Sequence, residues 1–173
     1  VVRNPRDRGV SLAFHNRYHE NNPGNFKESK LATDFDAVKF TVMGSSFECW
    51  NKNQEYLMWR NHSTHSDRSD NKLPYIWTSY EWLLSDTYRE VKAILDFIGS
   101  NASDLRVKQM IKNHSFKSKS ARNPGDEDRR NNWRRKGVML DWINWYDSDM
   151  AEHTKDVQEK YWELLIRSQN KNG

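Results

Sequence analysis

The sequence has very little cysteine and no long hydrophobic run. Its one cysteine, Cys49, excludes an internal disulfide and fits a reducing compartment, or one where disulfides are not needed. No stretch approaches the roughly 20 apolar residues of a membrane-spanning helix, and no signal peptide is visible, so we expect no membrane span and a cytoplasmic location. Three Asn-x-Ser sequons, at Asn61, Asn101 and Asn113, keep the lumen of the secretory pathway open as an alternative.

Apolar residues are scarce as well. Of the 173 residues, 35% are hydrophobic and 30% are charged, while eight tryptophans contribute to an aromatic content of 13%. Because aliphatic side chains are few, the aromatic residues must supply much of any buried area. The length suffices for one domain with a core. A net charge of +4 and a pI near 9.1 suit an anionic ligand, but they are too mild to indicate nucleic acid by themselves.

The first eleven residues have the pattern of a strand–turn–helix junction that can bind an anion. An apolar stub ends at Arg3, the chain turns at Asn4-Pro5, and Asp7 can cap the helix that follows. A helix N-terminus offers unpaired N–H groups, and a guanidinium suits phosphate oxygens. We therefore expect Arg3 and Ser11 to face one anion. The alternative is an ordinary junction with a solvated arginine.

A second basic element lies far along the chain. It runs Trp133-Arg134-Arg135-Lys136-Gly137-Val138-Met139-Leu140-Asp141-Trp142-Ile143-Asn144. A glycine lets the main chain approach a ligand closely, so the cations and the backbone at Gly137 can meet at one point. Most basic runs are solvated loops. Here the flanking Trp133 and Trp142 should fix the loop to a core, which favours anion binding.

Taken together, these segments resemble the cytosolic-type sulfotransferase family, which uses 3′-phosphoadenosine 5′-phosphosulfate (PAPS). Residues 3–11 resemble its motif Arg-Asn-Pro-Lys/Arg-Asp with a serine eight residues after the arginine, and residues 135–144 resemble its signature Arg-Lys-Gly-x-x-Gly-Asp-Trp-Lys-Asn. Three more landmarks follow the family's order: Tyr80-Glu81 with a leucine after it, the helical segment 89–99, and His114-Ser115-Phe116. The chain departs from the signature at Leu140, in place of its second glycine, and at Ile143, in place of its lysine.

The resemblance implies an α/β fold, a P-loop-like parallel sheet flanked by helices, with its N-terminal part missing from this chain. Residues 1–173 would then be the C-terminal portion of a single sulfotransferase domain. The family's phosphosulfate loop and catalytic histidine belong upstream of Val1, so we assign no catalytic residue and expect this fragment alone to be inactive. His15, His19 and His114 are candidate bases, but we assign none of them this role. We expect no metal, because the pair His15 and His19 has no third ligand at a useful spacing.

The resemblance also implies a function. The chain would carry the 3′-phosphate-binding half of an enzyme that transfers a sulfuryl group from PAPS to a hydroxyl or amine of a small molecule or glycan, leaving adenosine 3′,5′-bisphosphate. The cofactor-binding residues would be Arg3, Ser11, Tyr80, Ser115, Phe116, Arg135, Lys136 and Gly137. Two alternatives are a non-catalytic nucleotide-binding remnant, and a basic polyanion- or nucleic-acid-binding module built on Arg129-Arg130 and Arg134–Lys136. We expect no nucleic acid, and we make no prediction of the oligomeric state.

Apolar periodicity predicts the remaining elements. We expect strands at Val1-Val2 and Tyr75–Thr78, side by side in a parallel sheet. Helices are predicted after Asp7, around 50–58, at 87–98 with a capping box of Thr87 and Glu90, at 103–112, and from Asp149 onward with an apolar face of Val157, Tyr161, Leu164 and Leu165. Residues 20–32 and 117–132 are rich in turn formers or polar residues and are predicted to be loops.

Overall fold

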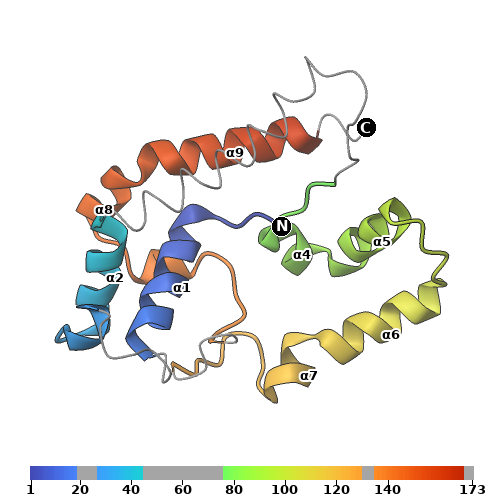
Figure 1. Ribbon diagram of the computed structural model, residues 1–173, viewed down its shortest axis with the longest axis horizontal. Helices are drawn as coiled ribbons and strands as arrows, with labels where there is room; N and C mark the ends of the chain where they lie inside the picture. Colours follow the sequence, from blue (N-terminus) through green and yellow to red (C-terminus); the bar gives the residue numbers. More distant parts are fainter. Residues whose placement is uncertain (19–26, 45–75, 130–134, 170–173) are drawn as a thin grey trace.

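The computed structural model describes residues 1–18, 27–44, 76–129 and 135–169. Its elements are α1 (Pro5–Tyr18), η1 (Lys27–Lys30), α2 (Asp34–Met43), α4 (Tyr80–Ser85), α5 (Thr87–Phe97), α6 (Asp104–His114), α7 (Phe116–Ser120), η2 (Asp141–Asn144), α8 (Ser148–His153) and α9 (Lys155–Gln169). Helix α9 runs along one side of the molecule, α2 and α8 lie at one end, and α4 to α7 form the other (Figure 1). The predicted helix around 50–58 lies outside the described residues.

The start of the chain pairs in parallel with the segment that precedes α4. The amide of Val2 donates to the carbonyl of Thr78 at 2.9 Å, and the amide of Tyr80 donates to the carbonyl of Val2 at 2.8 Å. The two apolar runs therefore lie side by side, as the sequence predicts. Within the described ranges, however, β pairing is confined to the Val2–Ser79 bridge, and no wider parallel sheet is seen there.

Helix α1 begins differently from the prediction. The carboxamide oxygen of Asn4, rather than the carboxylate of Asp7, accepts a hydrogen bond from the amide of Arg6 at 2.9 Å in the first turn. Asn4 is fully buried, and asparagine at this position satisfies an amide that the helix itself leaves without a partner. The predicted capping role of Asp7 is therefore wrong, and its carboxylate is available for another contact.

The clearest predicted helix, α5, forms over Thr87–Phe97, but its cap is one residue earlier than expected. The carboxylate of Asp86 accepts from the amide of Arg89 at 3.1 Å. The Thr87 hydroxyl instead donates to the carbonyl of Leu83, and Glu90 accepts from the Thr78 hydroxyl at 2.8 Å. Glu90 is thus used in a buried tertiary contact, which explains why the predicted capping box does not form. Helix α6 starts after its cap Ser103, as predicted.

Two predicted loops contain helical turns. In the segment 20–32, residues 27–30 form η1, and Glu28 is buried there. Its carboxylate accepts from the Asn16 amide at 2.9 Å and from the Thr41 hydroxyl at 3.0 Å, so it joins α1 to α2. In the segment 117–132, the first residues belong to α7. The last predicted helix is two helices, because α8 begins after its cap Asp147 and ends before α9.

Aromatic residues complete a small aliphatic core, as the composition suggests. The buried members are Val10, Ala13, Phe14, Val38, Val42 and Met150, and the half-buried Tyr18, Trp142, Trp145 and Tyr146 pack against them. The rings of Phe14 and Trp145 meet edge to face with centroids 5.0 Å apart. A second cluster joins Val2 to α9 through Tyr161 and Leu165. Among the described helices, none is long and apolar enough to span a membrane.

Candidate functional site

Arg3 leaves the parallel bridge and stacks on Tyr80. Its guanidinium carbon lies 4.5 Å from the centre of the Tyr80 ring. The Nε atom of Arg3 is buried and has no hydrogen-bond partner in the described part of the chain. A buried arginine N–H without an acceptor costs free energy, and an anionic acceptor at this position would remove that cost. Burial raises the pKa of the Tyr80 hydroxyl, and the charge of Arg3 opposes that rise.

A buried carboxylate fixes this corner of the molecule. Glu81 follows Tyr80 in α4, and its carboxylate accepts from the amide of Asn4 at 2.9 Å. The Tyr161 hydroxyl of α9 donates to its other oxygen at 2.6 Å. One side chain therefore holds together the segment that carries Arg3, the start of α4 and the last helix. Glu81 of the Tyr80-Glu81 pair therefore stabilises the fold, whether or not a ligand is bound.

The loop 135–142 is fixed to α1 by Asp7. Its carboxylate accepts from the amide of Leu140 at 2.7 Å and from the amide of Trp142 at 3.0 Å. Burial raises the pKa of Asp7, and these two backbone hydrogen bonds act in the opposite direction. The two motifs that the sequence singles out are therefore in direct contact, and Asp7 joins them.

The two cations of this loop share one buried carboxylate. Arg135 and Lys136 both pair with Asp141, Lys136 at 2.7 Å, and Arg135 also pairs with Glu127. Burial alone would raise the pKa of Asp141, but the hydrogen bonds from Arg135 and Lys136 outweigh it and lower the pKa. This pairing therefore contributes stability above the ordinary aspartate value of 3.8, and the contribution is lost as the pH falls below it.

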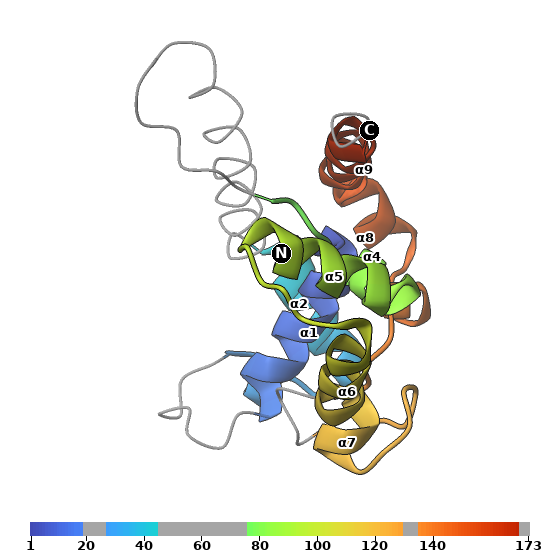
Figure 2. The same ribbon diagram turned by 90° about the vertical axis from the view of Figure 1, so that its right-hand side faces the viewer.

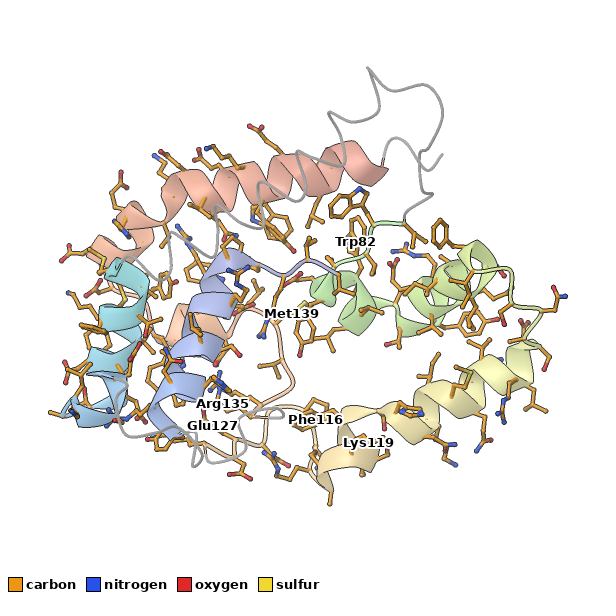
Figure 3. The ribbon with its side chains drawn as sticks, in the orientation of Figure 1. Trp82, Phe116, Lys119, Glu127, Arg135 and Met139 are labelled. Carbon is orange, nitrogen blue, oxygen red and sulfur yellow. The ribbon has the colours of Figure 1, made fainter. Side chains whose placement is uncertain are left out.

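Ser11 lies on the face of α1 along which the loop passes. Asp7, Ser11 and Phe14 are spaced four and three residues apart, so they share one face of the helix. The loop touches this face on both sides of Ser11, through Asp7 and through the Arg135 guanidinium, which lies 4.3 Å from the Phe14 ring centre. Figure 3 shows Arg135 beside α1, with Met139 further along the same loop. Ser11 itself is half-buried.

Gly137 and Phe116 are in such close contact that only glycine fits. Gly137 has a φ of +68°, and a Cβ atom there would lie 2.4 Å from a carbon of the Phe116 ring. Next to this contact is a cavity of about 510 Å³. Its lining comes from α4 to α7 and the loop: Leu83, Leu84, Thr87, Val91, Met110, Ile111, His114, Ser115, Phe116, Pro124 and Gly137. Phe116 points from α7 toward the loop (Figure 3).

Five of the eight predicted residues thus fall into two groups. Arg3 and Tyr80 are in contact, and Ser115, Phe116 and Gly137 surround the cavity. The positive charge of Arg135 also opposes the rise that burial causes in the pKa of the Tyr80 hydroxyl. Side chains of Arg135 and Lys136 point to Asp141 rather than toward Arg3.

Sequence reasoning missed three charged residues that shape this region. Asp7 and Asp141 hold the loop, and both belong to the quoted motifs, which is the signal that could have found them. Arg8 is the third: burial and the neighbouring charge of Arg3 lower its pKa. Of the candidate bases, His114 is exposed at the cavity, and His19 lies outside the described residues. In the parts that the structure describes, no three His, Cys, Asp or Glu side chains are grouped as a metal site would require.

Comparison with known families decides what these motifs represent. The model of the family described as "Sulfotransferase domain" matches residues 1–168. The chain belongs to the sulfotransferase domain family. The family predicted from the motifs is thereby confirmed, and the residues at Arg3–Ser11 and in the loop 135–142 lie inside the match.

A solved sulfotransferase structure has a similar fold. The crystal structure of mouse sulfotransferase SULT7A1 complexed with PAP matches with a TM-score of 0.61 and 20% identity. The match covers 90% of this chain and 54% of the mouse chain, so this chain spans about half the length of that relative. Searched against curated protein sequences, the chain has no match.

The departure from the family signature at Leu140 is strained. Leu140 has a φ of +61°, the left-handed conformation that costs an ordinary residue about 1–2 kcal/mol and a glycine almost nothing. We expect Leu140→Gly to stabilise the protein by about 0.5–1 kcal/mol, the remainder after the greater chain entropy of glycine is subtracted. Urea unfolding measures the change. As a control, Leu105→Gly at an exposed position of α6 should destabilise by about 1 kcal/mol, because the backbone there is helical. If both substitutions change the free energy of unfolding in the same direction, the backbone at Leu140 is not strained.

Proposed function

We propose that the chain binds the 3′-phosphoadenosine end of PAPS and serves a sulfotransferase that passes the sulfuryl group to a hydroxyl or amine. The observation that carries the proposal is the buried Nε of Arg3, which has no acceptor among the described residues. It lies at the entrance to α1, where the loop 135–142 is docked by Asp7. The mouse sulfotransferase complex contains PAP, adenosine 3′,5′-bisphosphate, which is the product expected from PAPS.

The 3′-phosphate would be bound by the residues around α1. Arg3 supplies the unpartnered N–H, and Ser11 adds a hydroxyl on the face along which the loop passes. Arg135, Lys136 and the backbone N–H of Gly137 would add donors from the loop. A phosphate dianion needs several charge-assisted donors, and arginine is suited to supply two of them at once. Asp141 holds both loop cations in the structure, so a phosphate would share them with this carboxylate.

The adenine would be bound between Tyr80 and the cavity. A volume of about 510 Å³ is in the range of small-molecule sites, and its lining is mostly apolar, which suits a flat purine. Phe116 offers a ring face, and Ser115 adds polar atoms at the cavity wall. The Tyr80 ring is held in place by Arg3 on one side and by the α4 backbone, which Glu81 anchors.

The chemical step itself is not assigned to residues of this chain. Bound PAPS supplies the activated sulfuryl group, and the transfer needs a base for the acceptor and cations near the leaving phosphate. We therefore propose that the 173 residues bind the nucleotide without turnover, inside a single domain of cytoplasmic location, and that the acceptor is a small molecule or a glycan.

Calorimetry tests the assignment of the 3′-phosphate site. We expect Arg3→Ala to weaken binding of adenosine 3′,5′-bisphosphate by about 1.5–3 kcal/mol, roughly 10- to 150-fold, the range for a hydrogen bond to a charged group. Adenosine 5′-monophosphate lacks the 3′-phosphate, so its weaker binding should be unchanged by the substitution. The matched control is Arg89→Ala, an exposed arginine of α5. Equal losses for both nucleotides, or no loss for either, would remove Arg3 from the site.

A further inference from the structure

Cations without acidic partners gather on α6 and α7. Residues 104–120 contain five lysines and arginines and one aspartate, so their excess of positive charge equals the net +4 of the whole chain. Arg106 and Lys112 are exposed and make no ion pair with any described residue. The lysines of α7 are exposed in the same way. By contrast, Lys39 and Lys92 each pair with a carboxylate of the protein. The charges of Arg106 and Lys112 are therefore left for a partner.

Large apolar side chains are exposed at the same edge. Ile98, at the end of α5, is 66% exposed, and Leu105, in the first turn of α6, is 79% exposed. Helices α5 and α6 run antiparallel, so the end of one and the start of the other lie together at one end of the molecule (Figures 1 and 2). A single exposed leucine is ordinary, but neighbouring ones beside unpaired cations indicate an interaction surface.

The two faces of α6 have different uses. Val107 is fully buried, and Met110, Ile111 and His114 line the cavity, so this side faces the protein. On the outward side, Leu105 is flanked by Arg106 and by Lys108 and Lys112, which follow it three and seven residues later. The outward side is thus an apolar centre with a basic border, and it is separate from the proposed nucleotide site.

We propose that this basic–apolar edge, defined as Ile98, Leu105, Arg106, Lys108 and Lys112, binds the surface of an anionic phospholipid bilayer. Interfacial helices place apolar side chains at the boundary of the acyl chains and lysines or arginines among anionic headgroups. A single-stranded nucleic acid would need free aromatic rings for stacking, whereas α6 has no aromatic residue of this kind and the Tyr88 ring of α5 beside it is already in contact with Lys108. A sulfated glycan would complement the cations, but it would leave Leu105 and Ile98 without a contact. The bilayer is the one partner that uses both features.

Co-sedimentation with vesicles tests the proposal. The chain should bind phosphatidylcholine vesicles that contain phosphatidylserine, bind pure phosphatidylcholine vesicles much more weakly, and be released by salt. The double variant Lys108→Ala/Lys112→Ala should lose affinity roughly 25-fold, since each lysine near an anionic surface is worth about fivefold. The matched control is Lys30→Ala/Lys155→Ala, two exposed lysines away from this edge, which should bind as the unchanged chain does. Thermal unfolding of each variant checks that the fold is intact.

The apolar part has its own test. Leu105→Ser should weaken vesicle binding several-fold, while Ile166→Ser, at an exposed isoleucine of α9, should not. Equal losses for the two lysine pairs would show attraction by net charge alone and overturn the proposal, as would equal binding to both kinds of vesicle or to neither. Tighter binding of a sulfated glycan or an oligonucleotide, with no effect of Leu105→Ser, would assign the edge to a soluble polyanion instead.

Discussion

Replacing Asp7 by alanine is expected to destabilise the protein by about 3–5 kcal/mol, the largest effect that we predict for a single substitution. The Asp7 carboxylate accepts hydrogen bonds from the Leu140 and Trp142 amides, and it is 1% exposed. A hydrogen bond to a charged group contributes about 1.5–3 kcal/mol, and the substitution would leave both amides without an acceptor. Because the loop carries Arg135 and Lys136, nucleotide binding should weaken together with stability.

Urea unfolding and binding of adenosine 3′,5′-bisphosphate measure the two effects of the Asp7 substitution. Asp156→Ala, at an exposed aspartate of α9, is the control and should change neither. Asp7→Asn keeps one acceptor oxygen, so its stability should lie between those of the wild type and Asp7→Ala. Burial raises the pKa of Asp7, so the folded state binds its proton more tightly and the wild type loses stability as the pH rises through that raised pKa. The stability difference between wild type and Asp7→Asn should therefore be smaller at neutral than at acidic pH.

The two basic motifs identified the family, because their residue types and spacing resemble the motifs of known sulfotransferases. Arginine, a helix N-terminus and a glycine in a basic loop are features that favour binding of an anion by main chain and side chains together. The parallel contact between Val2 and Ser79 was also predictable, since two apolar runs precede helices. These features are local in the sequence and need no knowledge of how distant segments meet.

The sequence could not predict which polar side chains form hydrogen bonds between distant segments of the chain. Asp7 and Glu90 both occupy positions typical of helix capping, yet each accepts a hydrogen bond from another segment, Asp7 from Leu140 and Glu90 from Thr78. Asn4 and Asp86 cap these helices instead. A neighbouring cap residue can satisfy the same amides at little difference in free energy, so tertiary contacts decide which one does. The same holds for Glu28, whose burial depends on contacts with α1 and α2.

In the proposed anion site, the loop 135–142 would contain an aspartate, Asp141, beside its cations. Asp141 is 3% exposed and neutralises two cations that would otherwise repel each other beside α1. A ligand phosphate would meet a loop that is already compact, so less ordering is required on binding. The cost is competition, because the phosphate and Asp141 must share the same donors. The unpartnered Nε of Arg3 has no such competitor among the described residues, which is why it carries the proposed site.

Replacing Gly137 by alanine is expected to lower stability by about 2–4 kcal/mol and to weaken nucleotide binding tenfold or more. Its φ of +68° costs a residue with a Cβ about 1–2 kcal/mol. The new Cβ would also lie 2.4 Å from the Phe116 ring, so the ring or the loop must shift. Either shift separates Phe116 from the Gly137 backbone, which together form one end of the proposed site. Urea unfolding and calorimetry with adenosine 3′,5′-bisphosphate measure the two losses.

Two further variants separate backbone strain at Gly137 from the clash with Phe116. Gly99→Ala is the matched control, since Gly99 has a similar φ of +74° and nothing within 4 Å of its added Cβ. It should show only the loss from backbone strain and should leave nucleotide binding unchanged. In a Phe116→Ala background, Gly137→Ala should cost no more than Gly99→Ala does, because the ring that the Cβ would meet is gone. If Gly137→Ala costs the same with and without Phe116, the contact between ring and glycine does not shape this loop, and the cavity wall must be defined by other residues.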